Sequence, residues 1–156
     1  MYKTEATMTG GCQCGAVRYA LYETPESTVC HCRMCQKAVG GPFAAFCKVK
    51  SAGFAWTRGD PSSFQSSSAA ERQFCAACGT PLTFRYLDGD AIEVTTGSLD
   101  DAARVPPTMN FGTEARLPWI ELLAPGRLPE TPTSASNSAT RVIVSRQHPD
   151  HNTPNG

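Results

Sequence analysis

Three cysteines lie close together in the stretch CHCRMC, which runs from Cys30 to Cys35. Thiolates are common zinc ligands, and three from one segment can reach one face of a single ion. A catalytic zinc keeps a fourth position for water or substrate, whereas a structural zinc is closed by four protein ligands. The spacing therefore predicts an open metal site on Cys30, Cys32 and Cys35. The alternative is a closed structural site, which a distant residue or His31 would complete.

Four more of the eight cysteines form two pairs, Cys12 with Cys14 in GGCQCG and Cys75 with Cys78 in FCAACG. Because tetrahedral zinc takes four ligands, the two pairs together make one closed site, and adding either pair to the triplet would give five. This arithmetic favours two zinc ions per chain, one structural and one open. A glycine follows each pair, where a positive backbone φ lets amides turn toward the thiolates.

The remaining cysteine, Cys47, lies in an alternating apolar run, which predicts a buried and inert thiol. Two other uses of clustered cysteines are possible. A thiol–disulfide oxidoreductase would use Cys32 with Cys35 or Cys75 with Cys78, but no βαβ pattern surrounds either pair. An iron–sulfur protein also clusters cysteines, and a colourless purified protein would exclude it.

The 156 residues include 14 basic and 14 acidic ones, so the formal net charge is zero. A neutral chain has no overall attraction to nucleic acid or to an anionic membrane, and we expect neither as a partner. The sequence contains no run of 18 apolar residues, and its start, MYKTEATMTGG, lacks the pattern of a secretory signal. Clustered cysteines without a signal suit a reducing compartment, so we expect a cytoplasmic location. The oligomeric state is not indicated.

Short alternating runs separated by glycine and proline turns predict a mainly β protein with antiparallel sheets and little helix. Strands are predicted over residues 17–22, 43–49, 53–57, 82–86, 91–95 and 118–123. The segment from Met34 to Gly41 predicts a short helical turn that its glycines stop, which would project Cys35 toward Cys32. Residues 24–27 are predicted as a turn, and the serine-rich residues 62–68 as a polar loop.

Beyond about Leu128 the sequence turns to proline, serine and threonine, with little to bury. We therefore predict a zinc-binding domain over residues 1–129 and a flexible polar tail over residues 130–156. Within the tail, residues 141–145 (RVIVS) could form an isolated strand. His148 and His151 have a spacing that could bind a metal, although tail histidines are more often solvated.

Substrate contacts are predicted beside the cysteine triplet. Zinc with three thiolates is net negative, and Arg33 and Lys37 could compensate that charge or hold a substrate carboxylate. The alternative is that both are solvated surface cations. Gly41, together with Gly40, could let a peptide-like substrate approach the backbone, or could simply end the short helix.

The motifs GGCQCGAVRY, CHCRMCQKAVGGPF, RQFCAACGTPLTFRY, VTTGSLDD and LPWIELL occur in this order between about residues 10 and 129. They resemble the glutathione-dependent formaldehyde-activating enzyme (GFA) family, which includes the domain of centromere protein V. The resemblance implies a β-tent fold stapled by zinc. It also implies a structural zinc on the two outer pairs and a catalytic zinc on the triplet. One departure is the stretch from Met109 to Phe111, where much of the family has a histidine.

The activity implied by this resemblance is the condensation of formaldehyde with glutathione, a carbon–sulfur lyase reaction in reverse. We therefore expect a zinc-dependent enzyme whose partners are a small thiol such as glutathione and a small aldehyde or related electrophile. A thiol is nucleophilic as its thiolate, and coordination to zinc removes its proton at neutral pH. The alternative is a zinc-stabilised binding or interaction module without catalysis.

Overall fold

The computed structural model describes residues 5–131 and 143–155. The smaller of its two sheets is antiparallel, with the strand order β1 (Met8–Gly11), β2 (Arg18–Leu21) and β5 (Phe54–Arg58). The larger sheet has the order β10 (Met109–Phe111), β3 (Glu26–Cys30), β4 (Ala44–Lys50), β9 (Ala91–Thr95), β8 (Pro81–Tyr86), β7 (Ala70–Phe74) and β6 (Ser62–Ser67). Its strands pair antiparallel except β10, which pairs parallel to β3.

Helical structure is short. In the part of the chain that the structure describes, α1 (Arg33–Val39) is the one α-helix, and it ends at Gly40 in the left-handed conformation. Single 3₁₀ turns occur at Ser51–Gly53, Thr96–Ser98, Ala102–Arg104, Thr113–Ala115 and Ile120–Leu123. None of the helices among these residues is long and apolar enough to cross a membrane. The prediction of a mainly β protein with little helix is confirmed.

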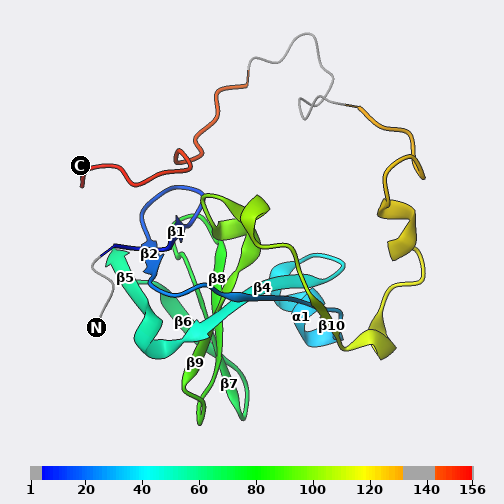
Figure 1. Ribbon diagram of the computed structural model, residues 1–156, viewed down its shortest axis with the longest axis horizontal. Helices are drawn as coiled ribbons and strands as arrows, with labels where there is room; N and C mark the ends of the chain where they lie inside the picture. Colours follow the sequence, from blue (N-terminus) through cyan, green and yellow to red (C-terminus); the bar gives the residue numbers. More distant parts are fainter. Residues whose placement is uncertain (1–4, 132–142, 156) are drawn as a thin grey trace.

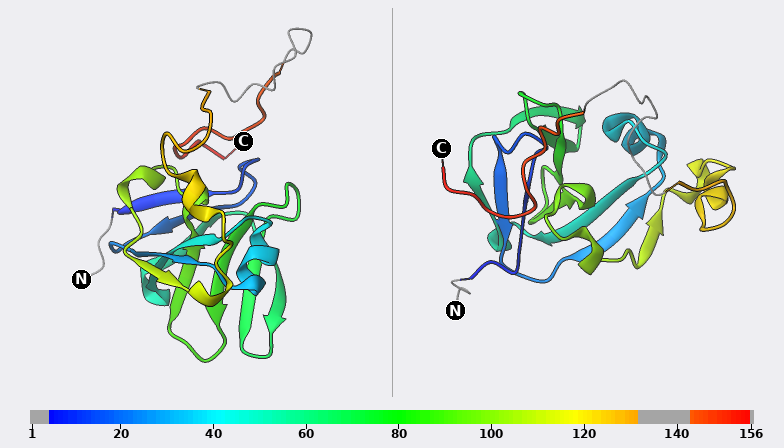
Figure 2. Two further views of the ribbon diagram at one scale, coloured as in Figure 1. Left: turned by 90° about the vertical axis from the view of Figure 1, so that its right-hand side faces the viewer. Right: turned by 90° about the horizontal axis from the view of Figure 1, so that it is seen from above.

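Figures 1 and 2 show the smaller sheet at one end of the domain and α1 with β10 at the other. The main core packs the two sheets together through side chains of both, among them Tyr19, Leu21, Leu82 and Val94. The Tyr19 hydroxyl lies 2.7 Å from the Ser98 hydroxyl, so the polar end of this buried ring has a partner. A second, smaller cluster lies under α1, and it includes cysteines of the triplet. The larger sheet therefore contributes side chains to two separate clusters, the main core and the cluster that contains the cysteine triplet.

Three predictions about local structure are wrong. Residues 62–67 form β6 rather than a loop, because β7 supplies hydrogen-bond partners and Phe64 packs on Phe74 with ring centroids 6.1 Å apart. The predicted turn at 24–27 overlaps β3, which begins at Glu26. The predicted strand at 118–123 is instead a 3₁₀ turn over Ile120–Leu123, and no strand in the described part of the chain pairs with it.

The last described residues lie against the smaller sheet. His148 donates its backbone N–H to Gln13 O (2.7 Å), and the side chains of Asn152 and Asn155 accept from Arg18 (2.8 Å) and Arg58 (2.9 Å). Ile143 to Ser145 form no strand, and Arg141 and Val142, in the same predicted strand, lie outside the described residues. The boundary at residue 129 stays a prediction.

Candidate metal centres and the adjoining pocket

The two cysteine pairs come together as one cluster. Cys12 and Cys14 lie in the loop after β1, and Cys75 and Cys78 lie in the loop between β7 and β8. The four sulfur atoms lie within 4.8 Å of one another. The Cys14 sulfur is 3.6 Å from that of Cys12 and 3.8 Å from that of Cys75. Thiolates held tetrahedrally about 2.3 Å from zinc would be about 3.8 Å apart, so this donor set fits the ion.

Hydrogen bonds to the cysteine sulfur atoms hold both loops in place. The Val17 N–H donates to the Cys12 sulfur (3.3 Å), and the Thr80 hydroxyl lies 3.2 Å from the Cys78 sulfur. Gly15 and Gly79 each have a φ of +79°, as predicted for the residues after the two pairs. Burial opposes ionisation of Cys78, but hydrogen bonds with Thr80 and Cys14 together outweigh it and lower the pKa of Cys78 to about 6. One cysteine of this cluster is thus readily ionised even without a metal.

The cysteine triplet forms a second cluster, at the end of β3 and the start of α1. Cys30 ends β3, Cys32 caps α1 by accepting the Cys35 N–H (3.4 Å), and Cys35 lies one turn into the helix. Their sulfur atoms lie within 4.8 Å of one another. Among the described residues, no other cysteine, histidine, aspartate or glutamate joins this group. The structure therefore offers three ligands here and four at the other cluster.

The acidity of the three thiols differs when no metal is bound. Burial raises the pKa of Cys30 to about 12 and also raises that of Cys35, where Arg72 acts in the opposite direction. Burial also opposes ionisation of Cys32, but hydrogen bonds from the Cys35 amide and from neighbouring groups lower the Cys32 pKa below its ordinary value. Binding of a metal to all three would therefore release protons from the cluster.

Arg72, on β7, was not identified from the sequence. It is only 6% exposed, and its Nη2 donates to the Cys35 sulfur (3.3 Å), while its Nε donates to the Ser66 hydroxyl (3.2 Å). Its guanidinium also lies 4.8 Å from the centre of the Phe84 ring. A buried cation requires an anionic partner, and a Cys35 thiolate supplies one. Arg72, which lines the same pocket, would thus offset the negative charge of metal-bound thiolates at the triplet.

His31 is buried and lies outside the group of converging sulfur atoms, so it does not complete the triplet. Its Nε2 lies 2.9 Å from Asn110 Oδ1 and donates to it, and its backbone N–H donates to Phe111 O (2.8 Å). Gln36 ties the same segment together, because its side chain donates to the carbonyls of His31 (2.7 Å) and Ala115 (3.0 Å). The stretch that departs from the family pattern therefore anchors the cysteine-bearing segment through Asn110.

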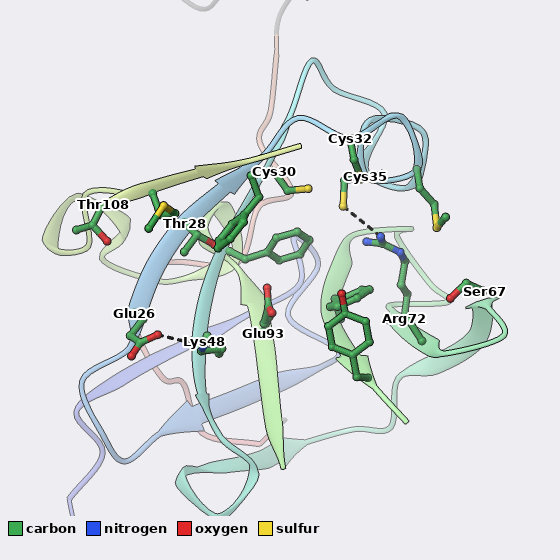
Figure 3. Close-up of a pocket in the computed structure, with 17 residues that line it drawn as sticks. Glu26, Thr28, Cys30, Cys32, Cys35, Lys48, Ser67, Arg72, Glu93 and Thr108 are labelled. Atoms are coloured by element: carbon green, nitrogen blue, oxygen red, sulfur yellow. Dashed lines mark hydrogen bonds and ion pairs between the residues drawn. The ribbon is translucent and has the colours of Figure 1, made fainter. Parts of the chain in front are cut away.

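The triplet opens into a pocket of about 580 Å³, a size suited to a small molecule. The residues that line it come from the larger sheet, β10 and α1, and they include Cys30, Cys32, Cys35, Phe46, Arg72, Phe84, Glu93, Met109 and Phe111. Figure 3 shows the sulfur atom of Cys35 directed toward the Arg72 guanidinium. Aromatic and methionine side chains thus wall a cavity that has the three thiols on one side.

The predicted substrate contacts lie elsewhere. Arg33 and Lys37 are exposed on α1, and Gly41 follows the helix; none of the three lines this pocket. Their role in substrate binding stays a prediction. Cys47 is fully buried, as predicted, and its sulfur lies 3.4 Å from the Thr96 hydroxyl. His148 and His151 join neither cysteine cluster.

Comparison with known proteins identifies relatives. Residues 7–115 match the glutathione-dependent formaldehyde-activating enzyme family. A protein of Schizosaccharomyces pombe named an uncharacterized lyase is 37% identical over 81 residues, which cover 51% of this chain and 58% of that protein. The chain thus matches less than two thirds of that relative. The crystal structure of a Rhodobacter sphaeroides protein superposes with a TM-score of 0.51 and 24% identity, over 65% of this chain and 100% of that one, and this likeness concerns the fold alone.

Proposed function

The chain belongs to the glutathione-dependent formaldehyde-activating enzyme family, and from this membership we propose that it is a zinc-dependent carbon–sulfur lyase-type enzyme. Its substrates would be a thiol such as glutathione and formaldehyde or a related small electrophile. The observation that supports this most is the contrast between the two clusters, because three thiols open into a cavity of about 580 Å³ while four others close on one another. An open three-ligand site is the arrangement of catalytic rather than structural zinc.

Cys30, Cys32 and Cys35 would hold the catalytic ion, and the outer pairs Cys12 with Cys14 and Cys75 with Cys78 would hold the structural one. Zinc held by these three thiolates would supply a coordination position that favours deprotonation of an incoming thiol at neutral pH. The proposed addition forms a bond from sulfur to the carbonyl carbon and breaks the carbonyl π bond. The thiol releases a proton and the carbonyl oxygen takes one up, so neither an oxidant nor a reductant is needed.

The chain's own residues would assist in two ways. Arg72 donates to the Cys35 sulfur and would offset the negative charge of the thiolate centre. Phe46 and Phe84 line the pocket beside it and would keep water away from the reacting groups. A lower local dielectric strengthens the interaction between Arg72 and the thiolates.

Two measurements test the proposal. Adding glutathione to protein with cobalt at the triplet should change the cobalt absorption, because a new sulfur ligand alters the coordination. The zinc-loaded protein should also accelerate exchange between glutathione and its formaldehyde adduct, as measured by magnetisation-transfer NMR against the spontaneous reaction. A spectral change without acceleration would mean that the site binds thiols for another electrophile. No spectral change with any thiol would favour a zinc-stabilised interaction module instead.

Arg72→Met should slow this exchange about tenfold to a hundredfold, the effect of losing a hydrogen bond to a charged group. Arg85→Met is the matched control, because Arg85 lies on the neighbouring strand and pairs with Glu71 in an exposed contact of 3.4 Å. Equal rates in the two variants would argue against a role for Arg72 in the reaction.

A further inference from the structure

A row of charged and aromatic side chains crosses the pocket side of the larger sheet. The strand register pairs Glu26 with Lys48, Lys48 with Glu93, Glu93 with Phe84, and Phe84 with Arg72. Residues paired directly across neighbouring strands project from the same face of a sheet. All five line the pocket, and Figure 3 shows the Glu93 carboxylate pointing into it between Lys48 and Arg72.

Both cations of this row already have partners. Arg72 donates to Cys35 and to Ser66. Lys48 Nζ lies 3.1 Å from Glu26 Oε2, in a pair whose side chains are 46% and 73% exposed. Glu93 differs, because across residues 5–131 and 143–155 its carboxylate takes part in no hydrogen bond or ion pair. The pocket therefore has no uncommitted cation but one uncommitted carboxylate.

Glu93 is also partly removed from water. Its neighbours Ile92 and Val94 are buried in the main core, so alternation along β9 directs Glu93 to the opposite, pocket face. Burial raises the pKa of Glu93, while Lys48 and Arg72 act in the opposite direction. A desolvated carboxylate without a partner is unfavourable, and a cation brought by a ligand would offset that cost.

We propose that Glu93 binds an ammonium group of the substrate thiol, and that the site thereby selects thiols that carry a protonated amine. This inference rests on the proposed function. Glu26, in the same row as Glu93, lies four residues before Cys30 on β3, which corresponds to about 13 Å of strand. The ammonium must therefore lie several bonds from the sulfur. Glutathione meets this condition through its γ-glutamyl α-ammonium group.

Isothermal titration of the zinc-loaded full chain with two thiols tests the proposal. N-acetylglutathione keeps the thiol and both carboxylates of glutathione but lacks the ammonium charge. We expect it to bind the unmodified chain about tenfold more weakly than glutathione, as for a charge-assisted hydrogen bond. Glu93→Gln should weaken glutathione by a similar factor and leave the affinity for N-acetylglutathione unchanged. The effects of Glu93→Gln and of N-acetylation on the binding free energy should thus not add, because each removes one partner of the same ion pair.

Glu71→Gln is the matched control, since Glu71 lies on β7 of the same sheet but does not line the pocket and is paired with Arg85. It should leave both affinities unchanged. Equal binding of the two thiols by the unmodified chain would overturn the proposal without using a variant. Additive effects of Glu93→Gln and N-acetylation would also overturn it. Binding of neither thiol would instead refute the proposed function, and this inference with it.

Discussion

The two cysteine clusters use the same ligand type but differ in what surrounds them. The four-cysteine cluster joins two loops, and Cys12 and Cys75 are buried in the main core. The three-cysteine cluster joins the end of β3 to α1 and lines a pocket. The four-cysteine cluster has four ligands because the loop between β7 and β8 adds Cys75 and Cys78 to Cys12 and Cys14. This loop adds no thiol to the triplet. The number of converging segments, more than cysteine spacing alone, distinguishes the clusters.

Two buried arginines extend this comparison. Arg18, at the end with four cysteines, makes a bidentate contact with Asp100, at 2.9 Å and 2.5 Å. Arg72, at the other end, makes its contact with Cys35, which is itself a candidate metal ligand. A buried guanidinium needs an anion in either place. Arg18 has the carboxylate of Asp100, which belongs to neither cysteine cluster, whereas Arg72 has Cys35, a candidate metal ligand.

The largest expected effect comes from Cys75→Ser. Binding of a structural zinc contributes directly to the free energy of folding, on the order of 10 kcal/mol in small zinc domains. We expect the variant to precipitate or to lack the native circular dichroism spectrum at 25 °C. Metal analysis and thermal unfolding test this. A soluble variant with an unchanged melting temperature would show that the four-cysteine cluster does not support the fold.

Asp100→Ala should cost about 3–5 kcal/mol in unfolding free energy, because it leaves the buried Arg18 charge without its carboxylate. Asp101→Ala is the control, since Asp101 and Arg104 are both 58% exposed and 4.0 Å apart. Its cost should be below about 1 kcal/mol. Chemical denaturation at pH 7 compares the two variants. Similar costs would mean that the Arg18 contact adds little to stability.

The Asp100 contact should also make stability depend on pH. Burial alone would raise the Asp100 pKa, but hydrogen bonds from Arg18 and Thr9 outweigh it and hold the pKa below its ordinary value of 3.8. A carboxyl group with a lowered folded-state pKa stabilises the fold above pH 3.8, and this stabilisation is lost as pH falls through the folded-state value. The difference between unmodified chain and Asp100→Ala should therefore shrink below about pH 4.

The sequence predicted local features better than distant ones. The seven clustered cysteines and the short helix depend on nearby spacing and on glycine, and the structure brings the cysteines together in the predicted groups. Strand β6 was missed because its serines resemble a loop until β7 pairs with it. The apolar run at 118–123 was predicted as a strand, but within residues 5–131 and 143–155 no strand pairs with it. Arg72 was missed because its partner, Cys35, is remote in sequence, and only the register of the sheet brings them together.

Cys35→Ser should have a smaller effect on the fold than Cys75→Ser. We expect a folded protein that contains about one zinc instead of two, because the triplet is not needed to join the two sheets. The melting temperature should fall because Arg72 loses its thiolate partner, but the variant should stay folded at 25 °C. Cys47→Ala, outside both clusters, controls for loss of a thiol and should retain both ions. Loss of folding equal to that of Cys75→Ser would show that the triplet is also a structural site.

The smallest expected effect concerns the C-terminal segment, whose described residues contact the smaller sheet and the Cys12–Cys14 loop. A chain ending at residue 129 should keep its fold and both ions, because Arg18 loses Asn152 but retains Asp100. Arg58 loses its contacts with Thr153 and Asn155, which are partly exposed. We expect a cost of about 1–2 kcal/mol, a few hydrogen bonds at partly exposed sites.

Asn152→Ala in the full chain should reproduce part of this loss of unfolding free energy. Treatment of the truncated chain with a chelator, followed by metal analysis, shows which cluster loses its zinc faster. Truncation should speed zinc loss from the four-cysteine cluster and leave the triplet unchanged, because His148 contacts the Cys12–Cys14 loop through Gln13 and no described tail residue lines the pocket. Faster loss from the triplet alone would mean that the segment acts on the open site through some other path. If truncation changes neither the rate of zinc loss from the two clusters nor the free energy of unfolding, the contacts of Arg18 and Arg58 with the tail do not contribute to stability.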